Sequence, residues 1–88
     1  MNNIENVIRE FVIEINDQMA SVKLTDTSSL QDSGFSSLDF VKLVLFVELK
    51  FEIEFPVEYM RPVYIDSISK IADIIRKVQE GHGDDIHE

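Results

Sequence analysis

The sequence predicts an all-α fold, a small four-helix bundle with three main helices, one short helix and a long first loop. Three segments place apolar residues at the i, i+3, i+4, i+7 spacing of an amphipathic helix. The segment FEIEF at 51–55 alternates like a strand, but no convincing second strand is present to pair with it. A chain of 88 residues allows one modest core, since domains of this size bury roughly 60–70% of their unfolded surface.

The first helix is expected to begin near Ile4. Asn2 can cap it, and Glu5, three residues further on, is placed to complete a capping box. The apolar stripe of this helix consists of Ile4, Val7, Ile8, Phe11, Val12, Ile15 and Met19.

A long ordered loop is expected from Ser21 to Phe35, where Thr, Ser, Asp and Gln dominate. Loops of this length are uncommon inside compact domains. The spaced apolar residues Val22, Leu24, Leu30 and Phe35 predict that the loop lies over the core.

The second main helix is expected to begin at the run GFSSLDF. Ser36 is a favourable N-cap, Asp39 lies at the N3 position, and residues 38–51 contain neither Gly nor Pro. One apolar stripe comprises Leu43, Val44, Val47 and Phe51, whereas Leu38, Val41 and Leu45 lie largely off it. A single core cannot easily bury both sets, so we expect an exposed apolar face.

Helix continuation fails between Phe51 and Pro56, because the residue before a proline is disfavoured in the α region. A short helical turn is expected at 56–60, with Pro56 at its first position. The last main helix is expected to be capped by Asp66 or Ser67 and to end near Gly81. Its stripe comprises Ile68, Ile71, Ala72, Ile75 and Val78. We therefore expect one domain over residues 1–80 and a flexible tail over residues 81–88.

Charge and composition exclude several classes of partner. The net charge of −9 repels nucleic acid and anionic lipid. The longest apolar run, Leu43 to Val47, is far too short to span a membrane, and the N-terminus does not read as a signal peptide. With no cysteine, a disulfide framework is excluded. We expect a soluble, cytoplasmic monomer that binds neither nucleic acid nor membrane.

No catalytic device is evident in the sequence. His82 and His87 both lie in the expected tail, so Ser37 has no obvious general base. With Asp84 and Asp85 these histidines are suitable ligand types for a divalent metal, but a solvated tail is the preferred interpretation. We expect a protein that is not an enzyme and holds no metal.

Two adjacent serines open the second main helix. A turn followed by a helix cap would explain one of them, and Ser36 supplies that cap. Ser37 would then lie on the first helical turn and face solvent. An anionic group on it would be stabilised by the positive end of the helix dipole and by free backbone N–H groups.

The run LQDSGFSSLDFVKLVLFVELKFEIEFP, residues 30–56, resembles the acyl carrier protein family, including its peptidyl and aminoacyl relatives. The attachment motif of that family reads Asp-Ser-Leu, with a Gly two places before the Asp. The resemblance implies that Ser37 carries 4'-phosphopantetheine and that Ser36 replaces the usual Asp. The thiol of the arm would hold an acyl or aminoacyl group as a thioester, and residues 1–80 would be a carrier domain.

The resemblance also implies partners. They are a phosphopantetheinyl transferase, which installs the arm from coenzyme A, an acyl- or aminoacyl-loading ligase, and downstream acyl-processing enzymes. In the second main helix two acids balance two bases, whereas the corresponding helix of fatty-acid-synthesis carriers is acidic. We therefore expect docking to rely on apolar contacts, in a specialised pathway of the polyketide or nonribosomal-peptide kind. The expected partner-binding residues are Ser36, Leu38, Asp39, Phe40, Val41, Lys42 and Leu45.

Two alternatives stay open. The chain could be an unmodified acidic helical module that binds a protein through the exposed face of the second main helix. Core packing is the alternative role for Phe40, and with less weight for Leu38 and Val41.

Overall fold

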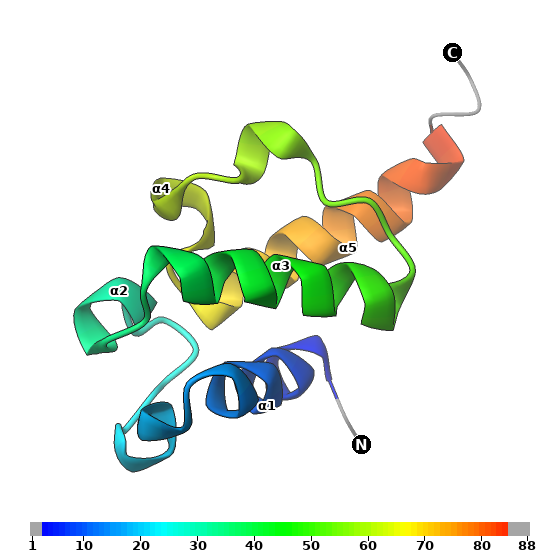
Figure 1. Cartoon of the computed structure of the whole chain (residues 1–88). Coiled ribbons are helices and arrows are strands. Elements are labelled where there is room, and N and C mark those ends of the chain that lie inside the picture. The colour runs from blue at the N-terminus through cyan, green and yellow to red at the C-terminus, as the bar shows by residue number, and fades with distance from the viewer. Residues whose placement is uncertain (1–2, 85–88) are drawn as a thin grey trace.

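The computed structural model describes residues 3–84, and the side chains of residues 3–81, and every regular element in this part of the chain is helical. The three main helices are α1 (Ile4–Ile15), α3 (Ser37–Phe51) and α5 (Ile68–Asp84) (Figure 1). Between them lie two one-turn helices, α2 (Leu30–Ser33) and α4 (Pro62–Ile65), and two 3-10 turns, η1 (Asp17–Ser21) and η2 (Val57–Tyr59). The predicted all-α class with three main helices is confirmed, although the connections contain more short helical turns than expected.

The main helices enclose one core, with α1 packed against both α3 and α5 (Figure 1). The rings of Phe11 and Phe46 meet edge to face at 5.3 Å and join α1 to α3. Two 2.8 Å hydrogen bonds from Arg76 to Glu5 join α5 to α1, and they lower the pKa of the Glu5 carboxyl. The buried apolar side chains are those of Ile8, Val12, Met19, Leu30, Phe35, Phe40, Leu43, Val44, Val47, Phe55, Ile65, Ile68, Ile71, Ala72, Ile74 and Ile75.

The cap of α1 is Asn3, whose side-chain oxygen accepts the N–H of Asn6 at 2.8 Å. The expectation that Asn2 caps this helix is therefore wrong by one residue, and Asn2 itself lies outside the described residues. With the cap at Asn3, Glu5 lies at the N2 position instead of N3 and does not complete a capping box; its carboxylate accepts two hydrogen bonds from Arg76 of α5 instead.

The long first loop does lie over the core, as expected. Leu30 and Phe35 are buried and Leu24 packs at the edge of the core. Val22 is 36% exposed, so the expectation that it anchors the loop is wrong.

Asp66, which lies between α4 and α5, holds this loop in place. Its carboxylate accepts the hydroxyl of Ser29 at 2.6 Å and the N–H of Gln31 at 2.9 Å. Nearby, the N–H of Ser69 donates to the carbonyl of Asp26 at 2.8 Å. These contacts join residues that are 35 or more positions apart and close the bundle at the end where α3 begins.

The end of α3 is set by Glu52, which takes the left-handed conformation with φ 55° and ψ 51°. The carboxylate of Glu48 then accepts the N–H of Phe55 at 2.9 Å and folds the following segment back. FEIEF at 51–55 forms no strand in the described structure.

The short helical turn expected at 56–60 is a 3-10 turn, and Pro56 is its N-cap rather than its first residue. The proline that does open an α-helix is Pro62, at the start of α4. In α5 the Ser67 hydroxyl accepts the N–H of Lys70 at 3.1 Å, so Ser67 acts as the cap.

The expected end of the last helix near Gly81 is wrong, because α5 continues to Asp84. Gly81 does not take the left-handed conformation that would end the helix there. The remainder of the predicted tail, residues 85–88, lies outside the described residues. None of the helices over residues 3–84 is long and apolar enough to cross a membrane.

Candidate functional site

The site is the N-terminus of α3, which begins with a complete capping box. The Ser36 hydroxyl accepts the N–H of Asp39 at 3.2 Å, and the Asp39 carboxylate accepts the N–H of Ser36 at 3.0 Å. The predicted capping roles of Ser36 and Asp39 are confirmed. The Ser36 hydroxyl is therefore used by the helix itself.

Asn16, which sequence reasoning missed, supports this cap from the end of α1. Its side-chain NH₂ group donates to the Asp39 carboxylate at 3.2 Å and to the carbonyl of Gly34 at 3.3 Å. Asn16 and Asp39 are 23 positions apart, so no local pattern in the sequence links them. The contact fixes the start of α3 relative to α1.

Gly34 turns the chain from α2 into α3. Its φ of 116° lies in the left-handed region, and its N–H bonds back to the carbonyl of Gln31 at 3.1 Å. A β-carbon at this position would lie 3.3 Å from the terminal methyl carbon of Met19. The backbone conformation therefore favours glycine two places before the cap, and a β-carbon there would also require the end of the Met19 side chain to shift slightly.

Ser37 is the first residue of α3 and is exposed. The first backbone N–H groups of an α-helix have no intrahelical acceptor and carry the positive end of the dipole. A negatively charged ester on the Ser37 hydroxyl would lie at this end. His82 and His87, the two histidines of the chain, lie outside the residues whose side chains are described.

An apolar groove of about 240 Å³ opens beside Ser37, between α3 and the segment that contains α4. Apart from Ser37, its lining side chains are apolar. They are Phe40, Val41 and Val44 of α3, together with Met60, Pro62 and Ile65. The groove places an apolar surface next to the exposed hydroxyl.

Most of the expected partner-binding residues lie on the surface of α3. Leu38 is 71% exposed, Val41 48% and Leu45 53%, and Lys42 is exposed as well. Leu38, Val41 and Leu45 form an apolar face that begins beside Ser37 and continues along the helix. Core packing, the alternative for Leu38 and Val41, does not hold for them.

Phe40 differs from the other expected partner-binding residues. It is 7% exposed, and its ring packs edge to face against Phe35 at 4.9 Å. The spacing of Phe40 from Leu43, Val44 and Val47 places it on the buried side of α3. Phe40 therefore forms a wall of the groove instead of an external docking surface.

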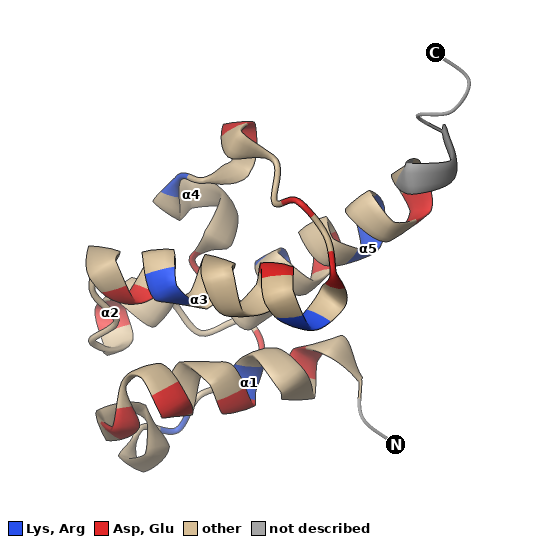
Figure 2. Ribbon diagram, turned by 45° about the vertical axis from the view of Figure 1, so that its right-hand side comes forward, with Lys and Arg blue, Asp and Glu red and all other residues tan. Residues whose placement is uncertain are grey.

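Acidic residues are distributed unevenly over the surface. Figure 2 shows them along α1 and along the connection from α3 to η2, whereas α3 carries both signs of charge. Among the side chains that the structure describes, no group of three or more acidic or histidine residues could hold a metal ion.

Comparisons with known proteins identify relatives that extend over most of the chain. The chain is 34% identical over 77 residues to proteins named acyl carrier protein from two strains, Tuc7 and APS, of Buchnera aphidicola subsp. Acyrthosiphon pisum. The aligned region covers 88% of this chain and 94% of each relative. No family model and no solved structure matches.

Proposed function

Because the chain belongs to the acyl carrier protein family, we propose that it carries an acyl or aminoacyl group as a thioester on 4'-phosphopantetheine attached to Ser37. The observation that carries the proposal is the division of roles between two neighbouring hydroxyls. Ser36 is used as the helix cap, whereas Ser37 is exposed on the first turn and borders an apolar groove.

The chemistry of attachment suits this position. The Ser37 oxygen would form a bond to the phosphorus that bears the pantetheine arm of coenzyme A, while the pyrophosphate bond breaks and adenosine 3',5'-bisphosphate leaves. A separate transferase would take up the serine proton, so the carrier needs no base of its own. The phosphodiester keeps a negative charge, which the first turn of α3 stabilises.

The groove beside Ser37 suits an apolar group at the end of the arm. Its volume of about 240 Å³ is below the roughly 300–1,000 Å³ of enclosed ligand pockets. It would therefore cover part of an acyl or aminoacyl group while leaving the arm free to move. The carrier itself performs no catalysis in this proposal.

Partner enzymes would approach the exposed face of α3. Leu38, Val41 and Leu45 offer apolar contact, with Ser36, Asp39 and Lys42 at the margins and Phe40 beneath them. Since the charges on α3 cancel, partners that present a strongly basic patch gain little from this helix. This supports a dedicated transferase, loading ligase and acyl-processing enzymes in a specialised pathway of the polyketide or nonribosomal-peptide kind.

The proposal is tested by intact-mass measurement after the purified protein is incubated with coenzyme A, Mg²⁺ and a broad-specificity phosphopantetheinyl transferase. We expect one phosphopantetheinyl increment in the wild type and in Ser36→Ala, and none in Ser37→Ala. Ser36→Asp restores the residue usual in the family and is expected to be modified at least as fast as the wild type. Absence of the increment with several transferases would contradict the proposal and favour the unmodified interaction module.

A further inference from the structure

Asn16, the C-cap of α1, ties this helix to the start of α3. Its NH₂ group donates to the Asp39 carboxylate at 3.2 Å and to the Gly34 carbonyl at 3.3 Å. Its side-chain oxygen accepts the N–H of Gln18 at 3.2 Å. One amide therefore holds the end of α1, the turn before α3 and the first turn of α3. Ser37 lies in that first turn, two positions before Asp39.

The bond between Asn16 and Asp39 gives the α1–α3 contact a direction. Within residues 3–81 it is the only side-chain hydrogen bond that joins α3 to α1 or to its cap. Further along the two helices, Phe11 and Phe46 meet through an apolar contact. Apolar burial is non-directional, whereas a hydrogen bond weakens steeply when its angle is distorted. Asn16 therefore positions the start of α3 more precisely than apolar packing does.

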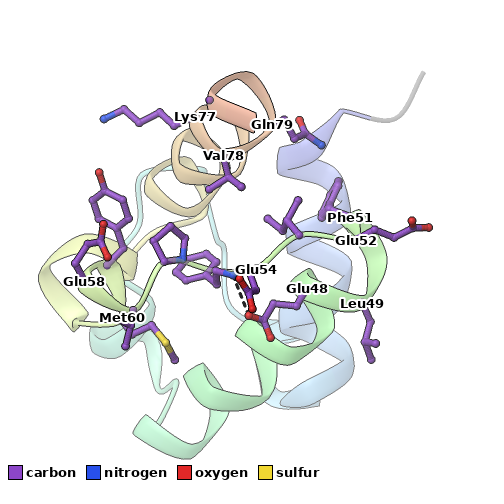
Figure 3. A pocket seen from close by; sticks show the side chains of 16 residues that line it. Glu48, Leu49, Phe51, Glu52, Glu54, Glu58, Met60, Lys77, Val78 and Gln79 are labelled. Carbon is purple, nitrogen blue, oxygen red and sulfur yellow. Dashed lines mark hydrogen bonds between the residues drawn. The ribbon is translucent and has the colours of Figure 1, made fainter. Parts of the chain in front are cut away.

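The other end of α3 is fixed in a different way. There the Glu48 carboxylate accepts the N–H of Phe55 at 2.9 Å, the bond that is dashed in Figure 3. This bond folds the following segment back onto its own helix and does not reach α1 or α5. Among the described residues, side-chain hydrogen bonding from α3 to another main helix or its cap is thus confined to the end that bears Ser37.

The first turn of α3 does not need Asn16 in order to form. Ser36 and Asp39 complete the capping box between themselves. Asn16 and Asp39 are half-buried and Gly34 is exposed, so water can replace the lost bonds at a modest cost in stability. A change at Asn16 is therefore expected to displace or loosen the first turn of α3 while the helix stays folded.

We propose that Asn16 is a positioning residue for phosphopantetheine attachment, a role that rests on the proposed function of Ser37. Asn16 holds the Ser37 hydroxyl where a bound transferase can align it with the phosphorus of coenzyme A. Misplacement of a reacting group by about 1 Å can cost about a hundredfold in rate. The exposed face formed by Leu38, Val41 and Leu45 is unchanged by a substitution at Asn16. The substitution therefore affects the rate of attachment within the complex and not the binding of the transferase.

The test is single-turnover attachment, in which the full chain, coenzyme A and Mg²⁺ are mixed with an excess of a broad-specificity phosphopantetheinyl transferase and the product is followed by intact mass. Variation of the transferase concentration separates the maximal rate from the half-saturating concentration. Asn16→Asp keeps an acceptor for the N–H of Gln18 but places a carboxylate against that of Asp39. We expect its maximal rate to fall about tenfold, with a change of less than about twofold in the half-saturating concentration.

A reversal of donor and acceptor tests whether the contact itself is responsible. In an Asp39→Asn background, the new amide can donate to the carboxylate of Asn16→Asp. The loss of rate caused by Asn16→Asp is therefore expected to be about threefold smaller in this background than in the wild type. Asn16→Ala adds no charge and is expected to slow attachment about three- to fivefold, so a failure of Asn16→Asp to fold would still leave a decisive variant.

Asn3→Ala is the matched control, because it removes the amide that caps the opposite end of α1 at 2.8 Å. We expect both kinetic constants of this control to stay within about twofold of the wild type. An equal loss in Asn3→Ala, wild-type rates in the Asn16 variants, the same loss in both backgrounds, or a loss confined to the half-saturating concentration would each overturn the proposal. A wild type that gains no increment would instead contradict the proposed function of Ser37, so the two failures are distinguishable.

Discussion

Substitution of Ser36 by alanine is expected to destabilise the fold, whereas the same substitution of Ser37 is expected to leave its stability almost unchanged. Ser36→Ala removes the hydroxyl that accepts the N–H of Asp39 at 3.2 Å. Loss of a Ser N-cap costs about 1 kcal/mol, within a range of about 0.5–2 kcal/mol. For a domain of this size that corresponds to a fall in Tm of about 4–8 °C. Ser37→Ala alters an exposed side chain, so its free energy of unfolding is expected to stay within about 0.5 kcal/mol of the wild type.

The assay is thermal and urea denaturation of the unmodified protein, followed by circular dichroism at a helical wavelength. Ser36→Asp is the matched control, because an aspartate also accepts the N–H at the N3 position and adds favourable charge at the helix N-terminus. We expect Ser36→Asp to be at least as stable as the wild type. A loss in Ser37→Ala as large as that in Ser36→Ala would refute the assigned division of roles.

Three further predictions concern the turn at Gly34, the hydrogen bonds of Asp66 and the ion pair of Glu5 with Arg76. Gly34→Ala is expected to destabilise by about 1–2 kcal/mol in urea denaturation, because alanine is strained at a φ of 116°; no loss would contradict the assigned turn. Asp66→Ala is expected to cost about 1–3 kcal/mol by leaving its loop donors without acceptors, and hydrogen exchange should increase at 25–33 first. Hydrogen bonds from Arg76 lower the pKa of the Glu5 carboxyl in the folded state. The pair therefore stabilises the protein fully at pH values above the pKa of Glu5 in the unfolded chain, about 4.3. This stabilisation is lost as the pH falls through the lower pKa of the folded state. The stability gap between wild type and Glu5→Gln should accordingly narrow on acidification, and a gap that widens would contradict this sign.

Local patterns predicted how α3 begins and which of its side chains are buried. The cap at Ser36 and its partner Asp39 are three residues apart, so both hydrogen bonds are encoded within one turn. Helical periodicity also separated Leu43 and Val47, which are buried, from Leu38, which is exposed. Periodicity did not settle the place of Phe40, for which exposure to a partner and core packing both stayed open.

Features that depend on tertiary contacts or on a choice between equivalent residues were not predictable in this way. The contact from Asn16 to Asp39 and those of Asp66 with the first loop join distant positions. Asn2 and Asn3 are chemically identical as caps, so the composition of the segment could not choose between them. Gly81 would end a helix if it took the left-handed conformation, but it continues α5 instead.

The two walls of the groove beside Ser37 are anchored to very different degrees. The α3 wall belongs to a 15-residue helix with a capping box and four buried side chains. The opposite wall includes α4, which has four residues, no side-chain cap and one buried side chain, Ile65. A 3.0 Å hydrogen bond from the Lys70 ammonium to the carbonyl of Val63 tethers it from α5. Displacement of α4 therefore requires a local opening and not unfolding of the core. The groove thus has one rigid wall, α3, and one wall that can move, α4. Its volume can adjust to the group that enters it.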